Sequence, residues 1–490
     1  MQYIGIDLGT SSVKLLLMDG TGKILNTVSK NYGLSFPKPG WSEQNPYDWY
    51  NETIEGLKDL TKDTDKEKIA GISFGGQMHG LVILDESDEV IRQAILWNDG
   101  RTGDECAYLN NEIGKDKLTE YTGNIAFTGF TAPKLLWLKK HEPDNFARIK
   151  KIMLPKDYIA YRLSGVHCTD VSDASGMLLF DVKNRRWSEK MCDICGIDIA
   201  MLPEIYESYE KVGVLKEELA DELGFHENCV IAAGAGDNAA AAVGTGTVGE
   251  GMCNISLGTS GTIFITTNEY KVDSHNALHS FAHADGSYHL MGCMLSAASC
   301  KKWWVSDIMG SDDYIEEQKK ITALGDNRVF FLPYLMGERS PHNDENARGA
   351  FVGMSMDTSR EDMSQAVLEG VAFALRDSLE VAKALGINLT KTKICGGGAK
   401  SSLWKRIIAN VLGLTVEVIK NEEGPALGGA ILAAVACGEY SNVKEAADKI
   451  VEVVDTVAPD KELSEKYDRK YKQFKKLYPA LKPVYSMLSE

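Results

Sequence analysis

The chain has 490 residues, of which 44% are apolar and 25% are charged, and its formal net charge at pH 7 is −17. This length exceeds what one ordinary hydrophobic core serves, so we expect two globular domains. The acidic balance disfavours nucleic acid and anionic membranes as partners, because both bind basic surfaces. The chain opens directly with a strand-like run and contains no long apolar stretch, so we expect a cytoplasmic protein without a membrane span.

Predicted strands and helices alternate along the first part of the chain. Strands are expected at 2–8, 13–18, 23–30, 69–75 and 80–85, with a helix at 46–61. A helix-rich stretch follows at 103–113, 131–142, 144–150 and 156–163, and after it comes a strand at 230–233. Strands that lead into helices favour α/β layers with mixed sheets.

The second part of the chain repeats this alternation. Strands are expected at 252–256, 262–266, 288–292, 329–332 and 393–395, and helices at 294–308, 360–385, 402–413 and 425–437. Apolar residues at helical spacing from Leu463 to Leu477 predict a docked amphipathic helix near the end of the chain. The glycine-rich seam at 244–252 is the best boundary, so we predict domains at 1–248 and 249–490.

One short turn occurs twice. The chain reads Ile6-Asp7-Leu8-Gly9-Thr10-Ser11 near its start and Ile255-Ser256-Leu257-Gly258-Thr259-Ser260 much later. Each copy joins two strand-like runs, which predicts a β-hairpin whose tight turn presents backbone N–H groups and hydroxyls to phosphate oxygens. Two such turns on opposite sides of a cleft would grip a polyphosphate between them.

Two ionisable residues accompany the first turn. Asp7 has Ser256 as its counterpart in the second copy, so only the first turn offers a carboxylate. That carboxylate would hold Mg²⁺ directly or through water, or would simply cap the turn. Lys14 lies on the outgoing strand, where it either reaches a phosphate or is an ordinary exposed strand lysine.

Asp237 stands where a strand gives way to an alanine-rich helix. The segment Gly234–Ala239 fits the letters of a dinucleotide-binding turn, but it lies far from a domain start and lacks the acidic residue expected further on. Asp237 would then either cap the helix or face a cleft as a base toward a substrate hydroxyl. The alanines at 239–242 allow close packing of the helix start, which favours a site.

Two glycine-rich segments lie in the second part. Gly396-Gly397-Gly398-Ala399 follows a strand and leaves bare backbone on which a flat ring or a ribose can lie, or else it is a close-packed turn between strand and helix. The proline-started segment 424–430 has small residues on one face, which is more typical of tight helix packing.

Other polar residues differ in what they indicate. His79 lies in a glycine-flanked loop after a strand, and with the Trp97–Arg101 motif it would suit a polyhydroxy substrate. The histidines at 275, 279 and 283 share a spacing of four that fits a helix face or a strand, without the glutamate of a zinc motif. Cys192 and Cys195 form an isolated C-x-x-C pair, so free thiols are expected.

Taken together, these motifs resemble those of the FGGY carbohydrate kinases, and most closely those of the xylulose kinases within that family. The similarity covers nearly the whole chain and runs in order through Asp7–Lys14, Gly40–Gln44, Gln77–Gly80, Leu96–Arg101, Gly129–Trp137, Leu154–Tyr158, Ala235–Ala239, Ser256–Gly261, Phe331–Tyr334, Gly337–Arg339, Gly349–Glu369 and Gly396–Ala399. The resemblance implies two ribonuclease H-like domains of the actin-like ATPase kind. ATP, Mg²⁺ and a sugar would meet in the cleft between them.

The resemblance also implies roles for individual residues. Asp237 would be the catalytic base, and Asp7 would help to place Mg²⁺. The sugar pocket would be lined by Met78, His79, Asp237 and Asn238. Gly258 and Thr259 would contact the phosphates of the nucleotide, and its adenosine would be bound by Gly397, Gly398 and Ala399. The first turn would also bind the phosphates, through Gly9, Thr10, Ser11 and Lys14.

The implied reaction is phosphorylation of a ketopentose by ATP, with D-xylulose as the first choice. Glycerol kinases carry Gln-Arg-Glu where this chain has Gln77-Met78-His79, which disfavours glycerol, whereas gluconate, ribulose and pentitols stay open. An actin- or chaperone-like ATPase without a sugar substrate is the alternative from another class, and a nicotinamide-dependent dehydrogenase is a third. Dimers are common among such kinases, so a homodimer is the assembly to look for.

Overall fold

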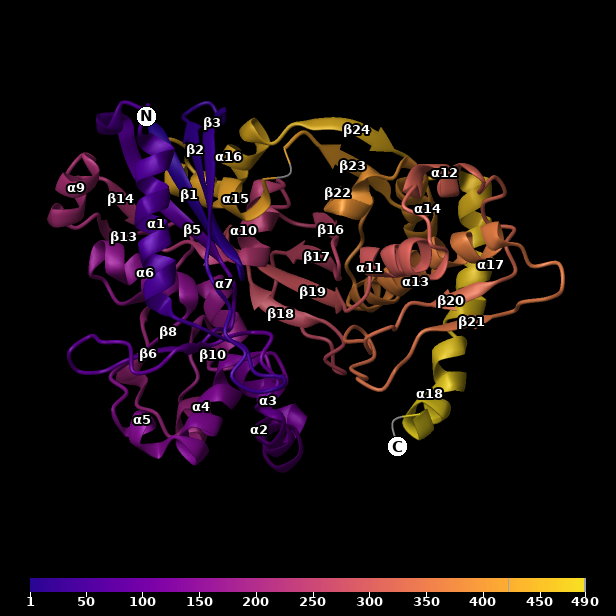
Figure 1. Cartoon of the computed structure of the whole chain (residues 1–490), viewed down its shortest axis with the longest axis horizontal. Coiled ribbons are helices and arrows are strands. Elements are labelled where there is room, and N and C mark those ends of the chain that lie inside the picture. Colours follow the sequence, from indigo (N-terminus) through magenta and orange to yellow (C-terminus); the bar gives the residue numbers. More distant parts are fainter. Residues whose placement is uncertain (422, 489–490) are drawn as a thin grey trace.

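The computed structural model describes residues 1–421 and 423–488. Its frame is two mixed β-sheets, one built by the indigo and purple part of the chain and one by the later part (Figure 1). Within the described residues, we find no helix with the length and apolar character needed to cross a bilayer.

The first sheet has the strand order β13-β14-β5-β1-β2-β3, with β15 added beside β5. Its strands are β1 (Gln2–Leu8), β2 (Ser12–Asp19), β3 (Ile24–Asn31), β5 (Ile69–Gly76), β13 (Lys211–Val214), β14 (Val230–Ala232) and β15 (Ala235–Gly236). Helices α1 (Pro46–Thr61), α6 (Pro155–Ser164) and α9 (Glu217–Leu223) bury apolar side chains against one face of this sheet.

The second sheet has the order β18-β19-β17-β16-β22-β23-β24. Its strands are β16 (Cys253–Leu257), β17 (Gly261–Thr267), β18 (His279–Ala282), β19 (Tyr288–Met294), β22 (Lys391–Cys395), β23 (Thr415–Ile419) and β24 (Val453–Val457). The run β19-β17-β16-β22-β23-β24 matches β3-β2-β1-β5-β14-β13 in order and in strand direction. The predicted repetition of one α/β frame is therefore confirmed.

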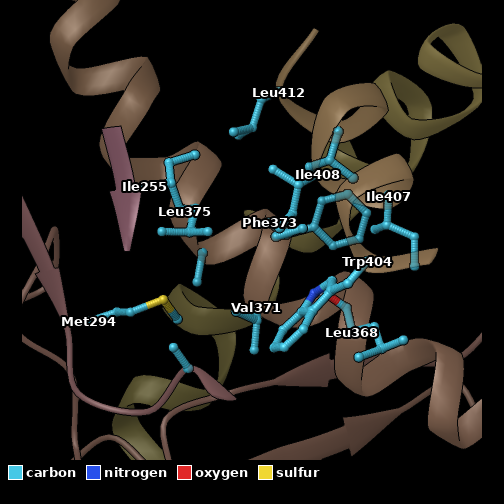
Figure 2. Close-up of a cluster of buried hydrophobic side chains, with 14 of the residues drawn as sticks. Ile255, Met294, Leu368, Val371, Phe373, Leu375, Trp404, Ile407, Ile408 and Leu412 are labelled. Atoms are coloured by element: carbon cyan, nitrogen blue, oxygen red, sulfur yellow. The ribbon is translucent and has the colours of Figure 1, made fainter. Parts of the chain in front are cut away.

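The core of the second half lies between its sheet and two long helices, α13 (Arg360–Ala384) and α14 (Ser402–Leu412). Figure 2 shows Trp404 of α14 beside Leu368 and Val371 of α13. The indole nitrogen of Trp404 donates a hydrogen bond of 3.0 Å to the carbonyl of Leu368. The buried indole N–H of Trp404 is therefore satisfied.

A helix-rich lobe extends the first half. Its helices are α2 (Gly103–Ala107), η2 (Tyr108–Gly114), α3 (Lys115–Thr122), α4 (Thr131–His141), α5 (Pro143–Ala147), α7 (Val171–Ala174) and α8 (Glu189–Cys195). Four short strand pairs accompany them: β4 (Glu43–Gln44) with β7 (Ala94–Ile95), β6 (Val82–Leu84) with β8 (Lys151–Met153), β9 (Cys168–Asp170) with β12 (Glu204–Tyr206), and β10 (Phe180–Asp181) with β11 (Arg186–Trp187). Its buried cluster includes Phe264 and Phe281 of the second half, so the two halves share apolar packing.

Two helices from different halves pack without side chains between them. Helix α10 (Asp237–Gly244) and helix α15 (Gly424–Ala436) lie together against the first sheet (Figure 1). A Cβ at Gly5 would lie 1.8 Å from the Ala426 carbonyl oxygen, and a Cβ at Gly428 would lie 1.9 Å from that of Ala240. The tight packing predicted for 424–430 and for the alanine run of α10 is confirmed.

Several predicted elements differ in their bounds. The helix expected at 294–308 is preceded by β19, which runs to Met294, so α11 begins at Ala298 (Ala298–Lys302) and continues as the wider-turned η5 (Trp303–Ile308). The terminal helix divides into α17 (Lys461–Phe474) and α18 (Leu477–Leu488), because Pro479 would clash with the carbonyl one turn earlier if α17 continued. Strands β23 and β24 and helices α3 and α16 (Val443–Ile450) were not predicted.

Filling the contact between α10 and α15 tests its role. We expect Gly428→Ala to destabilise the protein by about 1–3 kcal/mol, because the added methyl group must displace backbone atoms. The midpoint of urea unfolding measures this loss. Gly103→Ala is the control, since Gly103 is exposed at the start of α2 with no atom within 4 Å of its added Cβ. Equal midpoints for the two variants would contradict the proposed close contact.

Candidate active site

Both repeated turns are β-hairpin turns. In the first, the register of β1 and β2 ends at Leu8 opposite Val13, and the N–H of Gly9 donates to the carbonyl of Ser12 at 3.0 Å. In the second, Leu257 lies opposite Gly261. The carbonyl of Thr259 accepts hydrogen bonds from Ala297 N at 2.9 Å and Ser299 Oγ at 2.7 Å. The hairpins predicted from the repeated pattern are confirmed.

A cavity of about 940 Å³ adjoins the second turn. Of the predicted nucleotide residues, Gly258, Thr259, Gly397 and Gly398 line it. Ala399 is buried beside the cavity, and the first-turn residues Gly9, Thr10 and Ser11 are not among its lining residues. The convergence of the two turns on one polyphosphate stays a prediction.

The sequence analysis missed most of the cavity wall. The unpredicted lining residues include Lys301, Lys302, Trp303, Tyr314 and Gln318. Burial lowers the pKa of Lys301, whose ammonium lies 5.2 Å from the ring centre of Tyr314. The basic and aromatic run Lys301-Lys302-Trp303-Trp304, in the middle of the helix predicted at 294–308, was the available signal.

The glycine turn after β22 serves two purposes. Gly396 has a φ of +87°, a backbone region that favours glycine. A Cβ at Gly397 would meet nothing within 4 Å, whereas a Cβ at Gly398 would lie 2.8 Å from Leu257 Cβ and 3.0 Å from the Trp404 ring. Gly397 therefore leaves backbone open to the cavity, and Gly398 lets the turn pack against the core.

Asp7 and Asp237 form a pair of poorly solvated carboxylates. Burial raises the pKa of Asp7 to about 7, with a further increase from the charge of Asp237 and a decrease from Lys14. Burial also raises the pKa of Asp237 to about 6. The N–H and the side-chain amide of Asn238 donate to Asp237 Oδ1 at 2.7 and 2.8 Å, which lowers that pKa. Two neighbouring acids in one site are suited to a cation and to proton transfer.

Asp237 is not a helix cap. Helix α10 begins at Asp237, and its N-cap residue is Gly236, so the capping alternative is wrong. The N–H of Gly236 donates to Ser172 Oγ at 3.1 Å, and that hydroxyl donates to the buried carboxylate of Asp170 at 2.5 Å. The backbone just before Asp237 is thereby fixed by a polar cluster that the sequence analysis did not single out.

The first turn is tied to its neighbours. Lys14 forms an ion pair with Glu423, which precedes α15. The indole nitrogen of Trp97 donates to Thr10 Oγ1 at 3.0 Å. A phosphate contact by Lys14 would therefore require exchange of a carboxylate partner for a phosphate.

Asn238 contacts Met78, which precedes His79 in the chain, and the role of these residues in lining a sugar pocket stays a prediction. Asn238 Nδ2 approaches Met78 Sδ at 4.0 Å. His79 has a φ of +68°, and its Nδ1 lies 2.8 Å from the carbonyl oxygen of Gly176. Burial lowers the pKa of His79 to about 3, so its ring is neutral. The His79 carbonyl accepts from the buried ammonium of Lys134 at 2.8 Å, which holds the loop in this conformation.

The Trp97–Arg101 motif departs from its predicted role. Arg101 and Asp99 are buried as an ion pair of 2.7 Å, and Arg101 also pairs with Glu43 at 2.7 Å. The guanidinium lies 3.7 Å from the ring centre of Trp41. The prediction that these groups face a substrate is wrong for Asp99 and Arg101, because their partners are within the protein. Trp97 is 46% exposed.

The remaining histidine and cysteine motifs hold no site in the described part of the chain. His279 lies on strand β18, so the strand alternative for this segment is the right one. Cys192 and Cys195 are buried free thiols on α8, as expected. Across residues 1–421 and 423–488, no group of three or more His, Cys, Asp and Glu side chains is arranged to hold a metal.

Comparisons with known proteins agree along the whole chain. Residues 2–244 match the N-terminal domain of the FGGY family of carbohydrate kinases, and residues 253–437 match its C-terminal domain. The chain is 38% identical to a xylulose kinase of Escherichia coli K12, over 98% of this chain and 99% of that protein. These matches extend over both sheets, so each half has its own counterpart in the family.

Solved structures are equally similar. A xyloylose kinase from Brucella ovis superposes with a TM-score of 0.94 at 38% identity, covering 99% of this chain and 100% of that one. A gluconate kinase from Lactobacillus acidophilus gives a TM-score of 0.94 at 28% identity, covering 99% of each chain. The predicted fold class, two α/β domains of the actin-like ATPase kind, is confirmed. The chain belongs to the FGGY family of carbohydrate kinases.

Proposed function

We propose that this kinase transfers the γ-phosphoryl group of ATP to the terminal hydroxyl of a ketopentose, D-xylulose, to give D-xylulose 5-phosphate. The observation that carries the proposal is the half-buried carboxylate of Asp237, at the start of α10 and beside Asn238, Met78 and Asp7. A carboxylate so placed accepts the proton of a hydroxyl held by the Met78–His79 loop. The relatives named as xylulose kinases support the choice of sugar.

Asp237 acts as general base in this proposal. With a pKa of about 6, the carboxyl group of Asp237 is mostly ionised at neutral pH. Because this pKa lies close to the working pH, the carboxylate also takes up a proton efficiently. The hydroxyl proton passes to Asp237 as the new O–P bond forms and the bond to ADP breaks. Positioning and charge stabilisation supply most of the acceleration of phosphoryl transfer.

The nucleotide occupies the cavity beside the second turn. Gly258 and Thr259 contact the phosphates, and Gly397, Gly398 and Ala399 form the surface for adenosine. Gly9, Thr10, Ser11 and Lys14 reach the phosphates from the other side when sugar binding draws the halves together. That closure also excludes water, which would otherwise be phosphorylated.

Asp7 is the residue proposed to hold Mg²⁺. Magnesium bound with a nucleotide takes one or two carboxylates, and its remaining ligands are phosphate oxygens and water. A single half-buried carboxylate beside Asp237 fits that requirement better than a full protein ligand set, which the described residues do not contain. When bound, the ion would neutralise charge on the triphosphate.

A gluconate kinase is the second candidate, because such a protein shares this fold at 28% identity. A panel of ketoses, pentitols and gluconate, each with ATP and Mg²⁺, decides between them through ADP formation. We expect D-xylulose to give the highest kcat/KM. A higher value for gluconate would replace the ketopentose proposal, and ADP formation that no sugar increases would favour an ATPase.

Replacing the base should separate chemistry from binding. We expect Asp237→Asn to lower kcat about 10²–10⁴-fold, the usual contribution of a general base. The Kd for ATP, measured by calorimetry, should stay near that of the wild type, because the nucleotide cavity is lined by other residues. Near-normal turnover by this variant would show that another group accepts the proton.

The two neighbouring glycines after β22 offer a matched pair for the nucleotide site. The valine side chain in Gly397→Val would point into the cavity and should raise the Kd for ATP about tenfold or more, because each 1.4 kcal/mol of lost binding free energy raises Kd roughly tenfold. The unfolding temperature of this variant should change little, since the added side chain meets no protein atom at its Cβ. Gly398→Ala should instead lower the unfolding temperature, because its Cβ meets Leu257 and Trp404. Unchanged ATP binding by Gly397→Val would contradict the assignment of the cavity.

A further inference from the structure

Arg339 lies in a second-half loop between β20 (Phe330–Leu332) and β21 (Ala350–Val352) that is fastened to β19. The N–H of Ser340 donates to the Cys293 carbonyl at 2.8 Å, and Cys293 N donates to Ser340 Oγ at 3.0 Å. The buried carboxylate of Glu338 accepts from Leu295 N at 3.0 Å and from Arg339 N at 2.8 Å. The backbone that presents the Arg339 side chain is therefore fixed.

The guanidinium of Arg339 rests on an aromatic wall from the first half. It lies 5.0 Å from the ring centre of Phe127, whose ring lies 5.4 Å from that of Phe130. The Phe130 ring in turn lies 4.6 Å from that of His79. Arg339 thus reaches across from the second half to the wall that continues into the proposed sugar pocket.

One carboxyl group, that of Glu338, lies close enough for the charge of Arg339 to lower its pKa, but burial raises that pKa to about 8, so this group is mostly protonated at neutral pH. Among residues 1–421 and 423–488, no carboxylate forms a close ion pair with the guanidinium of Arg339. His79 and His279 are neutral, because burial lowers the pKa of each and the charge of Arg339 lowers it further. A half-buried guanidinium that only donates hydrogen bonds is suited to an oxygen acceptor from a ligand.

The Cys293 thiol lies between Arg339 and Asp237. Burial raises the pKa of Cys293, the charge of Arg339 lowers it, the charges of Glu338 and Asp237 raise it, and a hydrogen bond with the Arg339 side chain lowers it. The proposed base and the guanidinium therefore border the same small region around this thiol. A sugar whose reacting hydroxyl is at Asp237 would extend its other end toward Arg339.

We propose that Arg339 is a specificity-determining residue that donates hydrogen bonds to the carbonyl-bearing end of the sugar, opposite the hydroxyl that is phosphorylated. The inference rests on the proposed function. A guanidinium requires an acceptor, and both the carbonyl of a ketose and the carboxylate of an aldonate provide one. Reduction of the carbonyl to an alcohol replaces this acceptor by a group that also donates. Arg339 thus selects for sugars that are oxidised at the non-reacting end.

The test compares D-xylulose with xylitol and D-arabinitol, the pentitols formed by reducing its carbonyl. We expect Arg339→Gln to lower kcat/KM for D-xylulose about 10- to 100-fold and for the pentitols less than about threefold, so that the preference for the ketose is lost. The KM for ATP should not change. Arg339→Lys keeps the charge without the planar fork and should lose part of the preference.

Arg348→Gln is the control, since Arg348 is exposed on the same loop and its guanidinium donates hydrogen bonds to the carbonyls of Glu345 and Ala347. Unfolding temperatures of all variants show whether the fold is intact. An equal loss for ketose and pentitol in Arg339→Gln and Arg339→Lys would mean that Arg339 only supports Phe127, which would overturn the inference.

Failure of the proposed function gives a different result. A wild-type enzyme that prefers gluconate would contradict the ketopentose proposal alone, and the same variants compared on gluconate and its alditol, D-glucitol, would then test Arg339. A wild-type enzyme that phosphorylates no sugar of the panel would overturn both proposals.

Discussion

The contact of α15 with β1 and α10 is the constraint on which the site depends. Gly5 and Gly428 let backbone meet backbone where a single Cβ would lie within 2 Å of a carbonyl oxygen. Helix α10 carries Asp237 at its first turn, and α15 comes from the second half of the chain. The position of the proposed base is therefore set by packing from both halves, although its own half supplies the sugar-pocket loop.

This constraint also explains the charge of the site. Asp7 and Asp237 are half-buried beside this packing, and the burial of their carboxylates raises the pKa of both. Lys14 is paired with Glu423 at the start of α15, so the proposed contact of Lys14 with a phosphate requires release of that carboxylate.

The features predicted from sequence are those with local causes. A glycine turn between two apolar runs fixes a hairpin within a few residues, and both hairpins were found at their predicted places. Arg101 was misjudged because its partners, Glu43 and Trp41, are distant in sequence and remove it from solvent. The cavity wall at Lys301–Trp303 was missed for the same reason, since a helical segment shows no cavity until its neighbours are placed. Strands β23 and β24 depend on pairing with β22 rather than on a pattern of their own.

The division of the sugar pocket between the halves links recognition to closure. A binding site of one rigid half distinguishes ketose from pentitol only through static contacts, and the two differ only by reduction of one carbonyl group to an alcohol. Arg339 comes from the second half, whereas Phe127 and His79 come from the first, so its contact with a sugar depends on how the halves meet. A sugar that satisfies the guanidinium stabilises the closed arrangement in which the phosphates and Asp237 come together. A sugar that leaves it unpaired weakens closure, and discrimination then acts on turnover as well as on binding.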